Sequence, residues 1–411
     1  MNNNNRHRFG VVSNVILARG CIGLIWASAG PLIPLIKQEF GISQGSAAWF
    51  ASIAPLTITL LAVPVGIIGI RYSLKKTFAV GAILQAAGIF ALFCNTYIPL
   101  LLTRVSFAAG TVIVASIGSA IVAEWVTGRE LPLVNGITMS FVNLANAVAF
   151  VATVPIALAL SWRAPIVIYG FLALTCAIAW LVFGRERRKE RVVAEAKEES
   201  TPKIQPELSL LQALTQRSTI LLALAVMGSW CLGNTMGAWL PTYYHEVFNM
   251  PLEKASSITA IVTGTGVVVC LIGGFLPQRI GRRKPFLIIP GVFMGLSAIC
   301  AVLFNNLAVI ILMVIFFGIF SNLQTPSLYT IPFELPNTSP RNAAITLFAL
   351  QCGGNFGNFM GPLIAGYITD MTGSYLPGFI IAAVLSLSLL AAGLLLPETG
   401  PAARKTILRK I

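Results

Sequence analysis

An arginine lies inside the first long apolar stretch of the sequence. Residues 14–30 read NVILARGCIGLIWASAG, and Arg19 is the charged residue among them. Arginine keeps its proton at any accessible pH, and placing one at the centre of a membrane helix costs about 2.5–3.5 kcal/mol on insertion scales. A guanidinium can bind a planar anion through two parallel hydrogen bonds. Arg19 therefore predicts an anion-binding site, and Trp26 follows on the same helical face, seven residues on.

Acidic residues are absent from the middle of every apolar stretch. The 14 Asp and Glu lie in tails, in loops or at the ends of stretches, and His7 lies in the N-terminal tail. Because no carboxylate would neutralise Arg19, we predict a small-molecule substrate that is anionic. His245 and Glu246, at the outer end of the seventh stretch, could exchange a proton, so protons or a counter-anion are the candidate coupling ions.

Other apolar stretches carry polar or aromatic residues on one face. We expect these to line a substrate site with Arg19 and Trp26, although amides can also serve as contacts between membrane helices. An alternative is a carrier that exports or imports a neutral or aromatic metabolite or a drug, with Trp26, Trp230 and Tyr329 as an apolar box. The candidates for lining the substrate site, besides Arg19 and Trp26, are Asn143 in the fifth stretch, Trp230 and Asn234 in the seventh, Asn322 and Tyr329 in the tenth, and Gln351 and Asn355 in the eleventh.

The composition places the chain in a lipid bilayer. Apolar types make up 56% of the 411 residues and charged types 10%, whereas soluble chains carry about 25% charged residues. A spanning helix needs about 20 mostly apolar residues. The sequence predicts an all-α integral membrane protein with twelve spans: 11–36, 47–70, 77–95, 98–122, 134–158, 164–184, 219–243, 256–277, 285–304, 307–331, 343–368 and 376–396.

The positive charge is unevenly distributed along the chain. The net charge of +14 would suggest a nucleic-acid partner for a soluble protein. With twelve spans, however, one side of the membrane receives only Lys37, Arg163 and Lys254 in its loops. The positive-inside rule then places both termini in the cytoplasm of a multi-pass protein of the cell (inner or plasma) membrane. The charge indicates topology, so no nucleic acid is expected as a partner.

The chain divides into two similar halves. Residues 185–218 form a hydrophilic stretch, which predicts a six-helix bundle over 1–184, a cytoplasmic linker over 185–218 and a second six-helix bundle over 219–411. Arg71 and Arg279 are 208 residues apart, and Glu124 and Glu334 are 210 apart. Such a repeat is typical of transporters whose binding site lies between the halves.

Residues 274–284, GFLPQRIGRRK, resemble the loop motif of the major facilitator superfamily, with Gln278 in place of the usual Asp. The first copy of this loop, residues 66–76, keeps Arg71 but little else of the motif. The resemblance implies two pseudo-symmetric bundles that work by alternating access, and Arg104 resembles the fourth-helix arginine of the superfamily, with a structural or gating role. Because cations are favoured at helix C-termini, we predict gating pairs Arg71–Glu124 and Arg279–Glu334 when the cytoplasmic side is closed.

Residues 30–43, GPLIPLIKQEFGIS, and 237–247, GAWLPTYYHEV, resemble the cyanate-porter branch of that superfamily. This resemblance implies a substrate among small anions and some small aromatic compounds. No nucleophile–base set, metal site or phosphate loop is recognisable, so we expect no enzyme activity, no cofactor and no metal. A monomer is expected, and a membrane sensor that does not transport is the alternative from another class.

Overall fold

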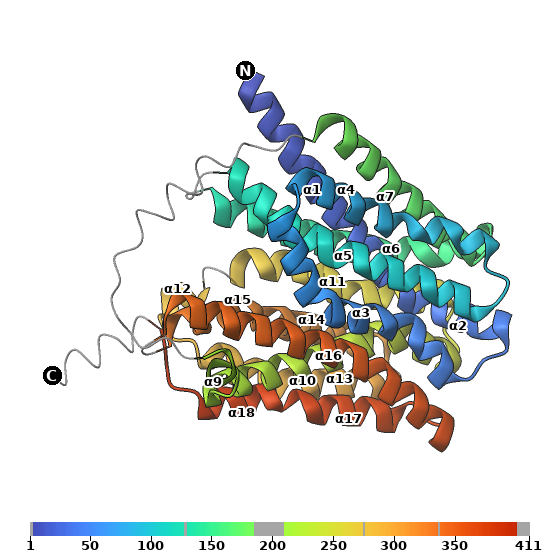
Figure 1. The fold of residues 1–411 in the computed structure, drawn as a ribbon. Helices are drawn as coiled ribbons and strands as arrows, with labels where there is room; N and C mark the ends of the chain where they lie inside the picture. Colours follow the sequence, from blue (N-terminus) through green and yellow to red (C-terminus); the bar gives the residue numbers. More distant parts are fainter. Residues whose placement is uncertain (1–2, 127–129, 185–208, 274–275, 336–337, 401–411) are drawn as a thin grey trace.

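The computed structural model describes residues 3–126, 130–184, 209–273, 276–335 and 338–400, and these residues form helices without a strand (Figure 1). The helices before the predicted linker are α1 (Asn3–Ala27), α2 (Ala29–Phe40), α3 (Gln44–Arg71), α4 (Leu74–Gln85), the 3-10 helix η1 (Ala86–Phe93), α5 (Tyr97–Trp125), α6 (Leu131–Ala159) and α7 (Arg163–Phe183). We call α1–α7 the N-half.

The remaining helices form the C-half. They are α9 (Leu210–Leu214), α10 (Arg217–Glu246), α11 (Leu252–Gly273), α12 (Leu276–Ile280), α13 (Pro285–Leu303), α14 (Leu307–Leu323), α15 (Thr325–Glu334), α16 (Pro340–Thr372), α17 (Leu376–Ser386) and α18 (Ser388–Leu395). Residues 185–208 of the predicted linker lie outside the described residues, and its last part forms α9 and the start of α10.

The helices account for the twelve predicted membrane spans. Ten spans in the described residues are long and apolar enough to cross a membrane. The long helices α11 and α16, of 22 and 33 residues, complete the twelve. Four spans consist of two consecutive helices: α1 with α2, α4 with η1, α14 with α15, and α17 with α18. The all-α membrane fold predicted from the sequence is confirmed.

In two spans the helix is broken a few residues before a proline. A proline cannot donate to the carbonyl four residues earlier, and its ring clashes with that carbonyl. Pro31 stands four residues after Ala27, where α1 ends, and Pro326 stands four residues after Asn322, next to the end of α14. The breaks fall at Ser28 and Gln324, in the first and tenth spans.

The two halves contact each other mainly through three pairs of helices. These pairs are α2 with α10, α3 with α16, and α6 with α11. We call the end of the bundle with Lys37, Glu246 and Asp370 the closed end, and the opposite end, with Arg8 and Arg283, the basic end. In Figure 1 the closed end, where α2 lies, is at the right, and α12 and α15 mark the basic end at the left.

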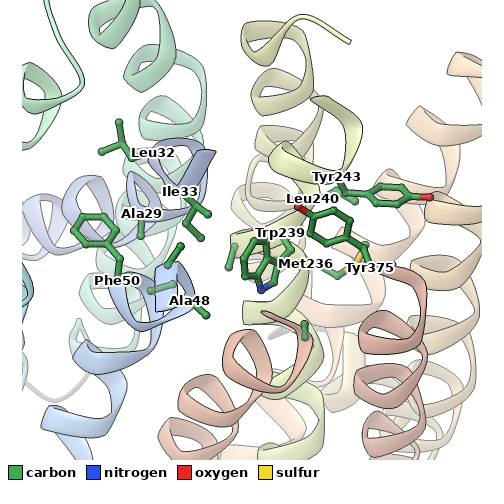
Figure 2. Packing of buried hydrophobic residues seen from close by; sticks show 14 of the residues in the cluster. Ala29, Leu32, Ile33, Ala48, Phe50, Met236, Trp239, Leu240, Tyr243 and Tyr375 are labelled. Atoms are coloured by element: carbon green, nitrogen blue, oxygen red, sulfur yellow. The ribbon is translucent and has the colours of Figure 1, made fainter. Parts of the chain in front are cut away.

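The largest buried apolar cluster belongs to both halves. It includes Leu32 and Ile33 of α2 together with Met236 and Trp239 of α10 (Figure 2). At Gly30 the backbones come so close that an added Cβ would meet the Gly237 carbonyl oxygen. The halves are therefore packed together by apolar contact near the closed end.

Candidate functional site

A cavity of about 370 Å³ lies between the two halves. The N-half contributes residues of α1, α2, α3 and α6, and the C-half contributes residues of α10, α11, α13, α14, α15 and α16. Both helix breaks described above open onto it, because Ala27 and Ala29 line it on one side and Gln324 and Thr325 on the other. A site shared by two halves can be reached from alternate sides when the halves rock against each other.

Amide, indole and hydroxyl side chains supply the polar surface of the cavity. Among its lining residues there is no Asp, Glu, Lys, Arg or His. The Asn234 Nδ2 donates to the Asn358 carbonyl oxygen at 2.6 Å, and the Asn322 Nδ2 donates to the Gly318 carbonyl oxygen at 2.8 Å. Of the residues predicted from the sequence to bind substrate, the lining includes Trp26, Asn143, Trp230, Asn234 and Asn322.

Gln324 is a cavity residue that sequence reasoning missed. It stands at the break between α14 and α15, and its side chain is 2% exposed. The Nε2 donates to the Ser321 carbonyl oxygen at 3.2 Å, while the Oε1 has no hydrogen-bond partner among the described residues. The signal was the sequence Gln-Thr-Pro inside an apolar span, since a proline there removes a helix hydrogen bond and disrupts the helix at Gln324.

Arg19 lies in the wall between α1 and α5 and is not among the lining residues of the cavity. Its side chain is 7% exposed, and one terminal nitrogen, Nη2, donates to the Ala115 carbonyl oxygen and to the Ser119 hydroxyl. The Nε is buried without a partner, and no described carboxylate forms an ion pair with the guanidinium. Ser119 itself is exposed, so the guanidinium reaches the edge of the accessible surface.

Arg104 has a different environment, deep within the N-half. Its Nε donates to the Phe50 carbonyl oxygen at 3.2 Å and its Nη1 donates to the Ile25 carbonyl oxygen at 2.8 Å. The guanidinium carbon lies 4.7 Å from the centre of the Phe50 ring and 5.3 Å from that of Phe107. Arg104 thus ties α5 to α1 and α3.

Three further predicted residues form a cluster outside the cavity lining. The Tyr329 hydroxyl donates to the Gln351 Oε1, and the Asn355 Nδ2 donates to the Gln351 carbonyl oxygen at 3.0 Å. Tyr329 belongs to α15 and the other two belong to α16, on the basic-end side of the break at Gln324. The cluster joins two helices of the C-half.

The predicted gating residues lie at the basic end. The side chain of Arg71 lies outside the described residues, and Glu124 is half-buried near the end of α5. Arg279 is exposed, and the carboxylate of Glu334 binds Arg283 instead, through Nε at 3.0 Å and Nη2 at 2.7 Å. The two predicted pairs concern a state closed at this end, and they stay predictions.

Metal binding finds no support in the described part of the chain, where no group of three or more His, Cys, Asp or Glu side chains is placed to hold an ion. Membrane-spanning helices in two halves that share a cavity are the architecture of a membrane transporter.

The chain belongs to the Major Facilitator Superfamily, whose family description matches residues 15–350 and 271–410. It is 24% identical over 378 residues to the probable sulfoacetate transporter SauU of Cupriavidus necator, covering 87% of each chain. It is 23% identical over 339 residues to the hexuronate transporter of Bacillus subtilis, covering 78% of each. The protein is therefore a transporter and not an enzyme.

A solved structure shares the fold at lower identity. The inward-facing, occupied structure of a bacterial homologue of the human lysosomal transporter Spinster has a TM-score of 0.76 and 16% identity, covering 95% of this chain and 96% of that chain.

Proposed function

We propose that this protein moves a small anion across the cell membrane by alternating access, as a secondary active transporter. The observation that carries the proposal is the buried Arg19 guanidinium, which has no carboxylate partner in the described structure and is only partly satisfied by hydrogen bonds. A permanent cation in an apolar wall is stabilised by an anion that reaches it.

Arg19 is well placed to meet a solute that approaches from the basic end. It lies seven residues before the cavity residue Trp26, which on a helix means the same face and about 10 Å along the axis. The exposed Ser119 lies beside it on α5. The solute would pass the guanidinium before it enters the uncharged cavity.

The relatives support the anionic class. Two of them are named as transporters of sulfoacetate and of hexuronate, and both compounds carry a carboxylate, which matches the planar fork of a guanidinium. The protein acts as a monomer with both termini in the cytoplasm, and transport is coupled to protons or to a counter-anion.

The test measures ligand binding to the purified protein and to two Arg19 variants. Small carboxylates, sulfonates and cyanate are expected to raise the melting temperature of the unaltered chain. Arg19→Gln should weaken binding of the effective anion about tenfold or more, because a charge-assisted hydrogen bond is lost. Arg19→Lys should weaken it as well, since the two-pronged geometry disappears.

Arg217→Gln serves as the matched control. It removes one exposed positive charge at the start of α10 and should leave binding unchanged. Anion binding that survives Arg19→Gln at full strength would contradict the proposed role of Arg19.

A second candidate function follows from the lining of the cavity itself. Trp26 and Trp230 contribute indole rings, and the lining has no charged side chain. Such a site suits a neutral or aromatic metabolite. Aromatic amides belong in the same ligand screen, and binding of these compounds with equal strength to the unaltered chain and to Arg19→Gln would favour this function over anion transport.

A further inference from the structure

The hydroxyl groups that line the cavity are arranged to accept hydrogen bonds. Three of them donate their one proton, at 3.1 Å, to a backbone carbonyl oxygen of their own helix: Ser229 to Val226, Thr263 to Ala260, and Ser321 to Gly318. A hydroxyl that has donated its proton keeps only lone pairs. These three oxygens can therefore accept a hydrogen bond from a solute but cannot donate one.

Gln324 adds an acceptor that has no partner. Its side chain is 2% exposed and lines the cavity, and its Oε1 forms no hydrogen bond within the described structure. The other end of the amide fixes its orientation, because the Nε2 lies 3.2 Å from the Ser321 carbonyl oxygen, which can only accept. A buried acceptor without a partner is unfavourable, so the Oε1 would gain from a donor that enters the cavity.

The N-half contributes a second oxygen of this kind. Asn146 of α6 lines the cavity, and its Oδ1 is buried without a hydrogen-bond partner among the described residues. Gln324 and Asn146 belong to different halves, so a solute that donates to both would contact both halves at once. The acceptor character is thus a property of the shared site and not of one helix.

A surface of acceptors selects the groups that can lie against it. A carboxylate or sulfonate group only accepts hydrogen bonds, so it would leave the oxygens of Gln324 and Asn146 unpaired. An ammonium group has donors, but none of the lining residues is an Asp or Glu that could pair with a buried positive charge. A hydroxyl group supplies a donor without a charge and therefore fits the cavity.

We propose that the cargo is a carboxylate that also carries hydroxyl groups, and that Gln324 selects it by accepting a hydrogen bond from a hydroxyl at the end far from the carboxylate. The Arg19 guanidinium binds the carboxylate, and the hydroxylated end enters the uncharged cavity. The carboxylate part of this inference rests on the anion transport proposed above, whereas the hydroxyl part rests on the cavity alone.

Pairs of acids that differ by one terminal hydroxyl test this inference. Butyrate is compared with 4-hydroxybutyrate, and propionate with 3-hydroxypropionate, by isothermal titration of the purified protein. The hydroxylated member of each pair should bind about tenfold more tightly to the unaltered chain, because it supplies the donor that the buried acceptors lack.

Gln324→Met keeps the length of the side chain and removes its acceptor oxygen. In this variant the two members of each pair should bind with affinities that agree within about twofold, because the hydroxyl no longer finds its partner. The affinity for butyrate and propionate should stay as it is in the unaltered chain. Thermal melting of the variant reports whether it is folded.

Thr263→Val and Thr57→Val form a milder, matched pair of substitutions. Each hydroxyl donates to a carbonyl of its own helix, at 3.1 Å for Thr263 and 2.8 Å for Thr57, but of the two only Thr263 lines the cavity. Thr263→Val should reduce the preference for the hydroxylated acids, and Thr57→Val should keep it.

The inference is overturned if the unaltered chain binds both members of each pair equally or binds neither, or if the preference survives in folded Gln324→Met. Arg19→Gln separates this result from the anion proposal, since it should weaken both members of a pair by the same factor and keep the preference. Full binding to Arg19→Gln contradicts the anion proposal, whereas equal affinity for hydroxylated and plain acids contradicts only the role of Gln324.

Discussion

At the scale of single residues, two arginines show how similar burial can serve different purposes. Arg104 is 3% exposed, bonds to carbonyls of two other helices and lies over two aromatic rings. Arg19 is 7% exposed but uses a single nitrogen for its hydrogen bonds. Arg104 therefore has its donors engaged by carbonyls of the N-half. The Nε of Arg19 has no partner in the described structure, and this is the donor capacity that the proposed anion site requires.

Arg104→Gln should lower the melting temperature of the purified protein more than Arg19→Gln does. The substitution removes the donors to the Phe50 and Ile25 carbonyls and the contacts with the rings. Charged hydrogen bonds of this kind contribute about 1.5–3 kcal/mol each. Thermal melting of both variants in the same detergent is the measurement, and equal melting temperatures would contradict the distinction between the two arginines.

At the scale of helices, hydropathy predicted where the spans lie in the sequence but not which helices pack against one another. The predicted spans 219–243 and 285–304 correspond to α10 at Arg217–Glu246 and α13 at Pro285–Leu303. Apolar length depends only on local sequence, which is why these ends were predictable. Which helix packs against a given face depends on residues far away in the chain, so the contact of Arg19 with α5 could not be derived.

The same limit applies to the candidate site. Helical spacing put Gln351 and Asn355 on one polar face. Only the packing of α15 on α16 shows that Gln351 binds Tyr329 and that neither of the two lines the cavity. The break at Gln324 was encoded by Pro326, yet proline also occurs within unbroken helices such as α6, which contains Pro155. Sequence therefore left the shape of the tenth span undetermined.

The glycines of α16 give a prediction for one pair of helices. Gly353, Gly357 and Gly361 are spaced by four residues, the pattern of close helix approach in membranes. An added Cβ at Gly357 would lie 2.0 Å from the Met227 carbonyl oxygen of α10. Gly357→Ala should destabilise the protein by about 1–3 kcal/mol through overpacking.

Gly264→Ala is the control for this prediction, because a Cβ at that position in α11 meets nothing within 4 Å. It should keep or slightly raise the melting temperature, since alanine favours helix. If the Gly357→Ala and Gly264→Ala proteins have the same melting temperature, α16 and α10 do not pack as closely as described.

At the scale of the whole molecule, the two ends differ in what holds them. Polar bonds and backbone contact join the halves at the closed end, through Lys37 with Glu246 and through Gly30 with Gly237. The strong ion pair at the basic end, Arg283 with Glu334, lies within one half. Weakening the closed end should therefore shift the molecule toward closure at the basic end, without unfolding either half.

Gly30→Ala tests this balance with a single methyl group. The new Cβ would lie 2.1 Å from the Gly237 carbonyl oxygen of the other half, so the halves must separate at the closed end. Labels carried by unnatural amino acids at Leu133 of α6 and Phe333 of α15, both exposed near the basic end, would report the distance between the halves. That distance should shorten in Gly30→Ala, while the melting temperature changes little because each half keeps its own contacts.

Gly136→Ala is the control, because a Cβ at that position in α6 meets nothing within 4 Å, and it should leave the label distance unchanged. A lowered melting temperature with an unchanged label distance would mean that Gly30 supports the fold and does not set the balance between the two ends.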